Sequence, residues 1–128
     1  MKNTKGPRDQ TYIQTNRANW NDRVAIHLRD DAGFYRVEAF LNGKDVRPDI
    51  DREEMYEFAG IDVLHLQCHF GLDTLSVARQ AKSVVGVDFS PKAITAACDL
   101  AKRVGLAGRA EFVLSDLYAT PMQVNRQF

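Results

Sequence analysis

The sequence predicts an α/β fold built on a parallel sheet. Three short stretches rich in branched apolar residues, 61–68, 83–88 and 110–115, alternate with two stretches of helical periodicity. The order strand, helix, strand, helix, strand is typical of a right-handed parallel β-α-β-α-β unit. With 128 residues, 45% of them hydrophobic, the chain suits one small domain that has a core of its own.

The first part of the chain is expected to be helical after a polar arm. Residues 1–15 show no sustained periodicity, which predicts a flexible arm. From Asn16 onward the pattern becomes helical, and the helix is expected to end near residues 30–33. The apolar face of this helix is formed by Trp20, Val24, His27 and Leu28. Shorter helices are predicted over residues 34–41 and 51–58.

The three strands follow in the second part of the chain. Residues 61–68 read IDVLHLQC, residues 83–88 read SVVGVD, and residues 110–115 read AEFVLS. Each stretch is dominated by residues that favour strands, and each is followed by polar or turn-forming residues. Because parallel strands end at the same edge of a sheet, the residues that follow these three strands are expected to lie close together.

The helices between the strands have recognisable ends. The first is predicted to begin at Leu72, directly after a glycine. The second begins at Ser90 and Pro91, because a serine side chain caps free backbone N–H groups and proline fits the first helical position. We expect this helix to reach Val104 and to stop at Gly105.

Composition argues against several classes of function. The 17 basic and 17 acidic side chains give a formal net charge of zero, which removes the electrostatic reason to expect a nucleic-acid partner. The sequence has neither the long apolar run of a membrane span nor a secretory signal. Cys68 and Cys98 lie in apolar surroundings and indicate reduced thiols in a cytoplasmic protein.

The residues at the strand ends have the character of a nucleoside site. Gly71 lets the backbone approach a ligand at the start of a helix, where free N–H groups favour an anion. Asp88 closes the second strand, and a carboxylate there can accept hydrogen bonds from both hydroxyls of a ribose. Phe89 offers a flat face to a purine, and Asp116 can accept from an exocyclic amine.

Each of these residues also has a purely structural interpretation. Asp88 and Asp116 can terminate strands and cap the following segments, Phe89 can belong to the core, and Gly71 can serve a tight turn alone. The joint pattern is more specific than its parts, because the residues fall on one edge of one sheet.

Three segments resemble the first three motifs of the class I S-adenosylmethionine-dependent methyltransferases: VLHLQCHFGLDTLSVARQ, VVGVDFSPKAI and FVLSDLY. The HLQCHFG motif is similar to the first motif of a bacterial subgroup of this family. Members of that subgroup also carry an upstream segment like NRANWNDRVAIHL followed by FY. The resemblance covers residues 16–128. It implies a Rossmann-like three-layer sandwich with strand order 3-2-1, a helical lid over residues 16–58, and the first half of the cofactor-binding domain over residues 59–128.

The resemblance also implies roles for individual residues. The cofactor-binding residues would be His65, Gln67, Cys68, His69, Gly71, Asp88, Phe89, Asp116 and Leu117. Among them, the loop from Gln67 to Gly71 would face the methionine part of S-adenosylmethionine, Asp88 the ribose, and Phe89 the adenine ring, with Asp116 and Leu117 at the adenine edge. The lid would place Trp20, Arg23, His27 and Tyr35 near the methyl group. No metal ligand and no catalytic base is implied, and His27 is a candidate base from its upstream position alone.

The sequence departs from the family pattern in the first motif. The family has an acidic residue at the position of His65 and glycines at the positions of Gln67 and His69. If strand alternation holds, His65 and Gln67 share a face, so the acceptor for the cofactor's ammonium would be a neutral imidazole or an amide. If His65 reaches the pocket, cofactor affinity should fall as the pH drops through about 6.5. The alternative is a histidine hydrogen-bonded locally within the strand.

The second departure concerns length. Class I methyltransferases continue with a fourth strand and several more, so the sheet here is expected to be truncated after the third strand. The first strand would then expose an apolar edge, and we expect the chain to self-associate through it. Such a chain can hold part of the cofactor site and lack turnover.

Other functions fit the residues less well. A nicotinamide-dependent oxidoreductase shares the β-α-β unit, but it expects GxGxxG where this chain has QCHFGL. A metal-binding module is conceivable because His65, Cys68 and His69 are close in sequence, although side chains on a strand and its turn diverge. For a methyltransferase the neutral charge argues against a nucleic-acid acceptor and leaves small molecules or proteins, of which we expect a small molecule, and the sequence does not name it.

Overall fold

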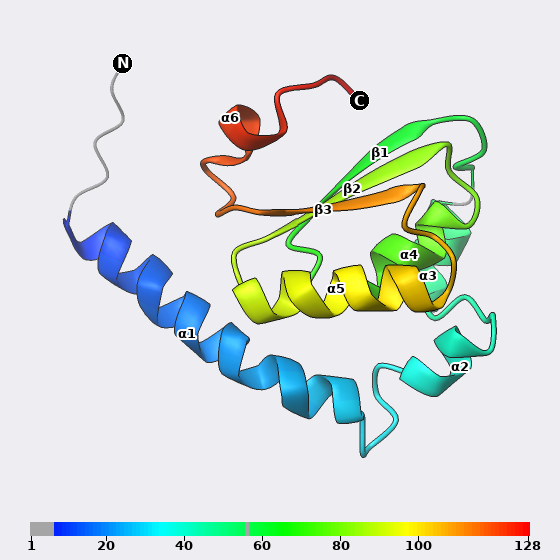
Figure 1. Ribbon diagram of the computed structural model, residues 1–128, viewed down its shortest axis with the longest axis horizontal. Coiled ribbons are helices and arrows are strands. Elements are labelled where there is room, and N and C mark those ends of the chain that lie inside the picture. The colour runs from blue at the N-terminus through cyan, green and yellow to red at the C-terminus, as the bar shows by residue number, and fades with distance from the viewer. Residues whose placement is uncertain (1–6, 56) are drawn as a thin grey trace.

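The computed structural model describes residues 7–55 and 57–128 (Figure 1). The elements in chain order are α1 (Pro7–Arg29), α2 (Val37–Leu41), α3 (Asp49–Glu54), β1 (Asp62–Leu66), α4 (Leu72–Ala78), β2 (Ser83–Asp88), α5 (Pro91–Arg103), β3 (Ala110–Leu114) and α6 (Thr120–Val124). None of the described helices is both long enough and apolar enough to cross a membrane.

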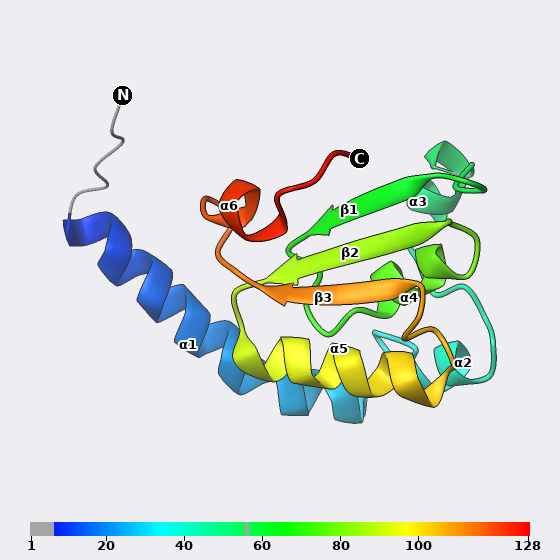
Figure 2. The same ribbon diagram turned by 45° about the horizontal axis from the view of Figure 1, so that its top comes forward.

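The three strands form one parallel sheet in the order β1-β2-β3. Leu64 lies opposite Val85 across the first pair of strands, and Val85 lies opposite Glu111 across the second. The arrowheads in Figure 2 therefore all point the same way, toward the end of the sheet where α6 lies. This arrangement confirms the predicted strand order 3-2-1 and the Rossmann-like α/β class.

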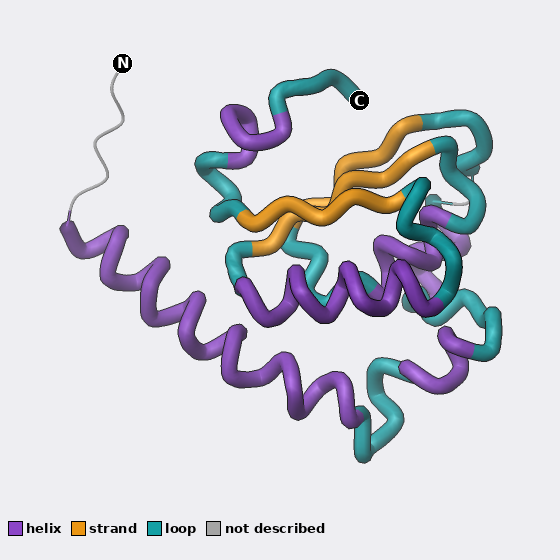
Figure 3. The backbone as a smooth tube through the Cα atoms, viewed as in Figure 1, coloured by secondary structure: helices purple, strands orange, loops and turns teal. Residues whose placement is uncertain are grey.

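One face of the sheet is covered by α4 and α5, and this side holds the main core (Figure 3). Val84 and Ala110 are register partners, so both side chains point toward these helices. Phe40, Phe70 and Leu75 fill the same cluster and are almost completely buried. Helix α1 packs against α5 on the side of the sheet that α5 covers.

The opposite face of the sheet is covered by the C-terminal segment. Val85 and Val87 point to this side and are only 1% and 2% exposed. Figure 1 shows α6 and the following residues on the side of the sheet away from α5. A cavity of about 530 Å³ remains between Leu64 and Leu66 of β1 and residues of the segment 117–128.

The predicted ends of α5 are confirmed in detail. The hydroxyl oxygen of Ser90 accepts a hydrogen bond from the backbone N–H of Ala93 at 3.1 Å, which satisfies one free donor of the first turn. At the other end Gly105 has a φ of 74°, and the N–H of Leu106 donates to the carbonyl of Ala101 at 2.8 Å. This pair of features forms a glycine-based helix stop.

Several helix boundaries differ from the prediction. Helix α1 begins at Pro7, so residues 7–15, expected to form part of a flexible arm, are helical, and residues 1–6 lie outside the described part of the chain. Residues 10–15 have no apolar periodicity because this end of the helix is mostly exposed to solvent. Helix α3 spans residues 49–54 instead of 51–58, and the short helix α6 was not predicted.

Candidate functional site

The loop between β1 and α4 has the backbone of a glycine-rich turn, although two of its three key positions are not glycine. Gln67, His69 and Gly71 have φ values of 58°, 54° and 84°. A non-glycine residue in this left-handed region costs roughly 1 kcal/mol or more. Positions 67 and 69, where the resemblance implies glycine, therefore adopt glycine-type backbone angles with other residues, at a cost in backbone strain.

Asp88 joins this loop to the end of β2. One carboxylate oxygen, Oδ2, accepts a hydrogen bond from the backbone N–H of His69, and Oδ1 accepts from the backbone N–H of Ser90, each at 2.9 Å. Asp88 is only 8% exposed, so both hydrogen bonds are shielded from water. The carboxylate thus fixes the β1–α4 loop against the start of α5.

Asp116 follows β3 at the same edge of the sheet, but its carboxylate makes local hydrogen bonds. Its Oδ1 accepts from the backbone N–H groups of Tyr118 and Ala119, both at 2.8 Å, as the structural interpretation of this aspartate expected. Leu117 is 42% exposed and lines the cavity on the second face of the sheet. Phe89 is partly buried.

A cavity of about 390 Å³ opens beside the β1–α4 loop. It is lined by residues 34–36, 46–49 and 68–73, so the N-terminal helical region and the loop share it. A volume of this size suits a small ligand. Of the predicted site residues, Tyr35, Cys68, His69 and Gly71 line this cavity.

Three side chains predicted for the lid meet the loop at His69. Nδ1 of His27 lies 2.9 Å from Nε2 of His69 and 3.0 Å from the hydroxyl of Tyr35. The Trp20 ring contacts the His69 ring edge-on, with the ring centroids 5.6 Å apart. We refer to Trp20, His27, Tyr35 and His69 as the imidazole cluster. The fourth predicted residue, Arg23, places its guanidinium 5.7 Å from the centroid of the Trp20 ring.

The environment of the imidazole cluster favours neutral histidines. Burial, assisted by the nearby His27, lowers the pKa of His69 to about 4. Burial and the positive charge of Arg23 lower the pKa of His27 as well, while burial raises the pKa of Tyr35. With both imidazoles neutral, Nδ1 of His27 can accept a proton or a hydrogen bond.

His65 is hydrogen-bonded within the body of the fold. Its Nδ1 lies 2.7 Å from Oγ1 of Thr74 on α4, and burial lowers its pKa. It does not belong to the described lining of the 390 Å³ cavity. Strand alternation, the condition for a shared face of His65 and Gln67, does not hold, because β1 ends at Leu66 and Gln67 has a φ of 58°.

The first motif does not gather a metal site. Cys68 is buried, and burial raises the pKa of its thiol to about 12. His65 contacts Thr74 while His69 contacts His27, so the two imidazoles are held by different helices. Among the residues that the structure describes, no group of three His, Cys, Asp or Glu side chains is placed to hold a metal ion.

Helix α1 is attached to the site region by Asn21. The amide oxygen of Asn21 accepts hydrogen bonds from the hydroxyl of Ser90 at 2.8 Å and from the backbone N–H of Lys92 at 3.0 Å. Because Ser90 also caps α5 and neighbours Asp88 through its N–H, α1 is held close to the loop. No motif in the sequence pointed to this contact.

Three residues near the cavity were missed by sequence reasoning. Phe70 is buried against the ring of His69, with ring centroids 4.6 Å apart, and its place within HLQCHFG was the only available signal. Arg36 lines the cavity with a φ of 56°, and Asp73 lines it from the first turn of α4. The unusual backbone of Arg36 leaves no mark in the sequence.

No protein-family model matches the chain, and no curated protein matches it significantly. Solved structures do match. The chain is similar to DhpI in complex with S-adenosylhomocysteine, with a TM-score of 0.59 and 23% identity over 83% of this chain and 46% of that one. It is also similar to phosphoethanolamine N-methyltransferase 1 from Haemonchus contortus in complex with phosphoethanolamine and S-adenosylhomocysteine, with a TM-score of 0.59 and 17% identity over 80% and 21% of the two chains.

A third similar structure is an RNA methyltransferase from Salinibacter ruber in complex with S-adenosylhomocysteine, with a TM-score of 0.50 and 25% identity over 55% of this chain and 46% of that one. The chain thus spans less than half the length of each of these three proteins. The shared fold is that of the class I S-adenosylmethionine-dependent methyltransferases, which confirms the resemblance of the three motifs at the level of the fold.

Proposed function

We propose that this chain is the cofactor-binding part of an S-adenosylmethionine-dependent methyltransferase. The observation that carries the proposal is the contact between the β1–α4 loop and the end of β2, where Asp88 accepts from the N–H of His69 at 2.9 Å. This contact holds the glycine-type turn of the β1–α4 loop beside the carboxylate of Asp88. Both lie at the carboxyl ends of the strands, which is where α/β proteins bind nucleosides. The same fold holds S-adenosylhomocysteine in the three similar structures.

The residues present fit such a cofactor. Asp88 uses each oxygen once, which leaves further lone pairs for ribose hydroxyls. The loop from Gln67 to Gly71 adopts the left-handed φ values that a close backbone approach needs. Phe89, Asp116 and Leu117 follow β2 and β3 at the same edge of the sheet, where we expect the adenine to lie. When bound, S-adenosylmethionine would supply an electrophilic methyl group on its sulfonium.

We assign the residues of α1 and the following loop to a lid over the reacting atoms. Methyl transfer needs an acceptor held in line with the methyl group and, for some acceptors, a base. His27 is the candidate base, since burial and the charge of Arg23 lower its pKa and favour the neutral imidazole, while Tyr35 and His69 orient the ring through Nδ1. In this scheme residues 16–58 form the lid segment and residues 59–128 the first half of the cofactor domain.

We favour a small-molecule acceptor. The phosphoethanolamine methyltransferase among the similar structures binds a small acceptor, and the net charge of zero gives this chain no general attraction for polyanions. RNA is the second candidate, because one similar structure is an RNA methyltransferase. RNA binding that weakens steeply with salt would support that second candidate.

We also propose that the protein is cytoplasmic and that it self-associates. Neither Cys68 nor Cys98 forms a disulfide, as expected in a reducing compartment. Within the described residues, β1 pairs with β2 alone, so its other edge is free to pair. Sedimentation across a range of protein concentrations tests this, and a monomer at every concentration would contradict self-association.

The cofactor proposal is tested by thermal unfolding with added nucleosides. S-adenosylmethionine or S-adenosylhomocysteine should raise the unfolding temperature progressively as its concentration increases above its Kd, because a ligand that binds only the folded state stabilises it. NAD serves as the comparison. Protection by NAD alone would favour the oxidoreductase, while binding of S-adenosylmethionine without turnover would favour a cofactor-binding fragment.

A further inference from the structure

The contact between His27 and His69 places one hydrogen between two imidazole rings. Nδ1 of His27 and Nε2 of His69 are 2.9 Å apart, and the ring centroids are 5.1 Å apart. The centroid separation is close to the N–N distance plus the two ring radii, so the two nitrogens point at one another, as in an N–H···N hydrogen bond. Because both rings favour the neutral form, one of these nitrogens carries the hydrogen and the other offers a lone pair.

The hydroxyl of Tyr35 indicates which nitrogen carries that hydrogen. It lies 3.0 Å from the same Nδ1 of His27. If Nδ1 has the lone pair, it accepts from the tyrosine hydroxyl and from Nε2–H of His69. If Nδ1 carries the hydrogen, that hydrogen points at His69, and the tyrosine hydroxyl loses its acceptor. The first arrangement makes two hydrogen bonds and the second makes one, so we expect both rings in the Nε2–H tautomer.

In this arrangement the free lone pair of the two rings is on Nδ1 of His69. The two nitrogens of an imidazole point in nearly opposite directions, so Nδ1 of His69 points away from His27. The His69 side chain lines the 390 Å³ cavity, and within the described part of the chain no hydrogen bond occupies its Nδ1. Nδ1 of His69 is therefore the atom at which a ligand in the cavity can deliver a proton.

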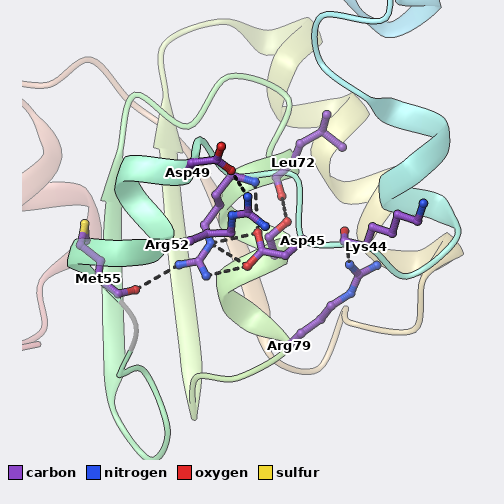
Figure 4. A network of polar contacts seen from close by, with 9 residues as sticks. Lys44, Asp45, Asp49, Arg52, Met55, Leu72 and Arg79 are labelled. Atoms are coloured by element: carbon purple, nitrogen blue, oxygen red, sulfur yellow. Dashed lines mark hydrogen bonds and ion pairs between the residues drawn. The ribbon is translucent and has the colours of Figure 1, made fainter.

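The carboxylates in and beside the same cavity are held by arginines. Asp45 forms a 2.6 Å ion pair with Arg47, and Asp49 is paired with Arg52, as Figure 4 shows. Burial raises the pKa of Asp73, and the positive charge of Arg47 opposes that rise. The imidazole cluster is thus the part of the cavity wall that offers neutral nitrogen bases.

A positive charge is better placed on His27 than on His69. Burial lowers the pKa of His69 to about 4, with a further lowering by His27 and an opposing effect of the Asp88 carboxylate. Burial and the positive charge of Arg23 lower the pKa of His27 as well, but His27 is the less buried of the two rings. A proton that arrives at His69 therefore has a route toward water through His27.

We propose that His69 and His27 form a proton relay that carries a proton from a ligand in the cavity to solvent. The proton enters at Nδ1 of His69, the hydrogen on Nε2 of His69 passes to Nδ1 of His27, and the hydrogen on Nε2 of His27 leaves to water. Exchange with water afterwards restores the two Nε2–H tautomers. His27, the candidate base, then acts through His69.

The inference rests on the proposed function, because the proton is the one that a hydroxyl, thiol or ammonium acceptor loses. The acceptor keeps the electron pair of that bond and uses it for the new bond to the methyl group. As the S–C bond breaks, its electron pair returns to the sulfur. The relay thus narrows the acceptor to a nucleophile that carries a hydrogen.

Nuclear magnetic resonance of ¹⁵N-labelled histidine rings tests the relay without an acceptor. At pH 7.5 we expect His27 and His69 each to have a protonated Nε2 and an unprotonated Nδ1, with a scalar coupling across the hydrogen bond between the rings. Tyr35→Phe should raise the fraction of Nδ1–H at His27 about fivefold, because one hydrogen bond is lost. Tyr12→Phe, at an exposed position of α1, should leave it unchanged. A protonated Nδ1 on either ring of the unaltered protein overturns the proposal.

Acidification tests the transfer between the rings. Because the relay shares the first proton, the signals of His27 and His69 should follow one curve as the pH drops from 7.5 toward 4. His27→Gln keeps an acceptor for Nε2–H of His69 but cannot pass a proton on, so His69 should then become protonated at a lower pH. Two independent curves, or protonation of His69 at a higher pH in the variant, overturn the relay. His65, bonded to Thr74, is the internal control, and its curve should be the same in both proteins.

The failure of this inference is distinguishable from that of the proposed function. The same samples are titrated with S-adenosylhomocysteine. If the nucleoside does not bind while the rings show the expected tautomers and one shared curve, the cofactor proposal fails and the relay stands without its role in methyl transfer. If the nucleoside binds and the rings titrate independently, the cofactor proposal stands and the relay is wrong. Unfolding temperatures without ligand confirm that each variant is folded.

Discussion

The backbone N–H of His69 donates a 2.9 Å hydrogen bond to Oδ2 of Asp88, across the gap between the first and second strands of the sheet. The other oxygen of the same carboxylate accepts from the N–H of Ser90. One side chain therefore positions both the loop that begins α4 and the segment that begins α5.

Asp88→Asn should destabilise the protein by about 2 kcal/mol, because an amide can accept at one oxygen only and leaves the second N–H without a partner. Nucleoside binding should weaken at least tenfold, since the loop loses its anchor. Urea unfolding and calorimetry measure the two effects. Asp99→Asn on the exposed side of α5 should change stability by less than about 0.5 kcal/mol, and an equal loss in both variants would contradict the role of Asp88.

Gln67→Gly should stabilise the protein. A non-glycine residue at a φ of 58° costs about 1–2 kcal/mol, while the extra freedom of glycine in the unfolded chain costs about 0.4–1 kcal/mol, so a net gain of about 0.5 kcal/mol is expected. Urea unfolding measures it. Gln67→Val, which adds a β-branched side chain at the same backbone angle, should instead lower stability. A glycine variant less stable than the unaltered chain would show that the loop is not strained there.

The imidazole cluster should make stability fall on acidification. The pKa of His69 is about 4 in the folded chain and about 6.5 when unfolded, so between these values the unfolded state binds the extra proton. Its contribution to stability is complete above about pH 6.5 and is lost as the pH drops toward 4. The lowered pKa values of His27 and His65 act in the same direction.

His69→Asn should flatten this pH dependence, and asparagine is chosen because it tolerates the left-handed backbone. Urea unfolding at pH 7.5, 6 and 5 provides the comparison. The unaltered chain should lose more stability over this interval than the variant. An identical slope for both proteins would remove His69 as a source of the effect.

The two thiols should differ in reactivity. Burial raises the pKa of Cys68 to about 12, so almost no thiolate forms at pH 8, whereas Cys98 is partly exposed on α5. With excess iodoacetamide on the folded protein, mass spectrometry should find Cys98 modified first, and both thiols modified in urea. Equal rates for both thiols in the folded protein would contradict the burial of Cys68.

The sheet and its order were predictable because each strand is marked by its own short apolar run of residues that favour strands. The run at 83–88 forms the central strand and is buried on both faces, so its apolar residues are nearly continuous. The run at 110–114 forms an edge strand, and it is apolar at every position except Glu111. Ser90 and Gly105 mark the ends of α5 by chemistry that acts within a few residues. Such signals can be read from the sequence without knowledge of the tertiary structure.

The rest depends on contacts distant in sequence. Residues 7–15 form a helix whose exposed surface needs no apolar pattern, so periodicity missed it. The pairing of His27 with His69 spans 42 positions, and neither neighbourhood reveals the other partner. The backbone on both sides of Arg36 is held by the two carboxylate oxygens of Asp30, and this geometry exists only after the turn has formed. The loop and the strand ends of the candidate site were therefore predictable from the sequence. The contacts that the N-terminal helical region makes with this loop were not.

The amide of Asn21 couples the position of α1 to the start of α5. Its single oxygen holds the hydroxyl of Ser90 and the N–H of Lys92, so α1 cannot swing outward without giving up both hydrogen bonds. Outward movement of α1 therefore breaks both hydrogen bonds together and takes from Ser90 and Lys92 a shared acceptor.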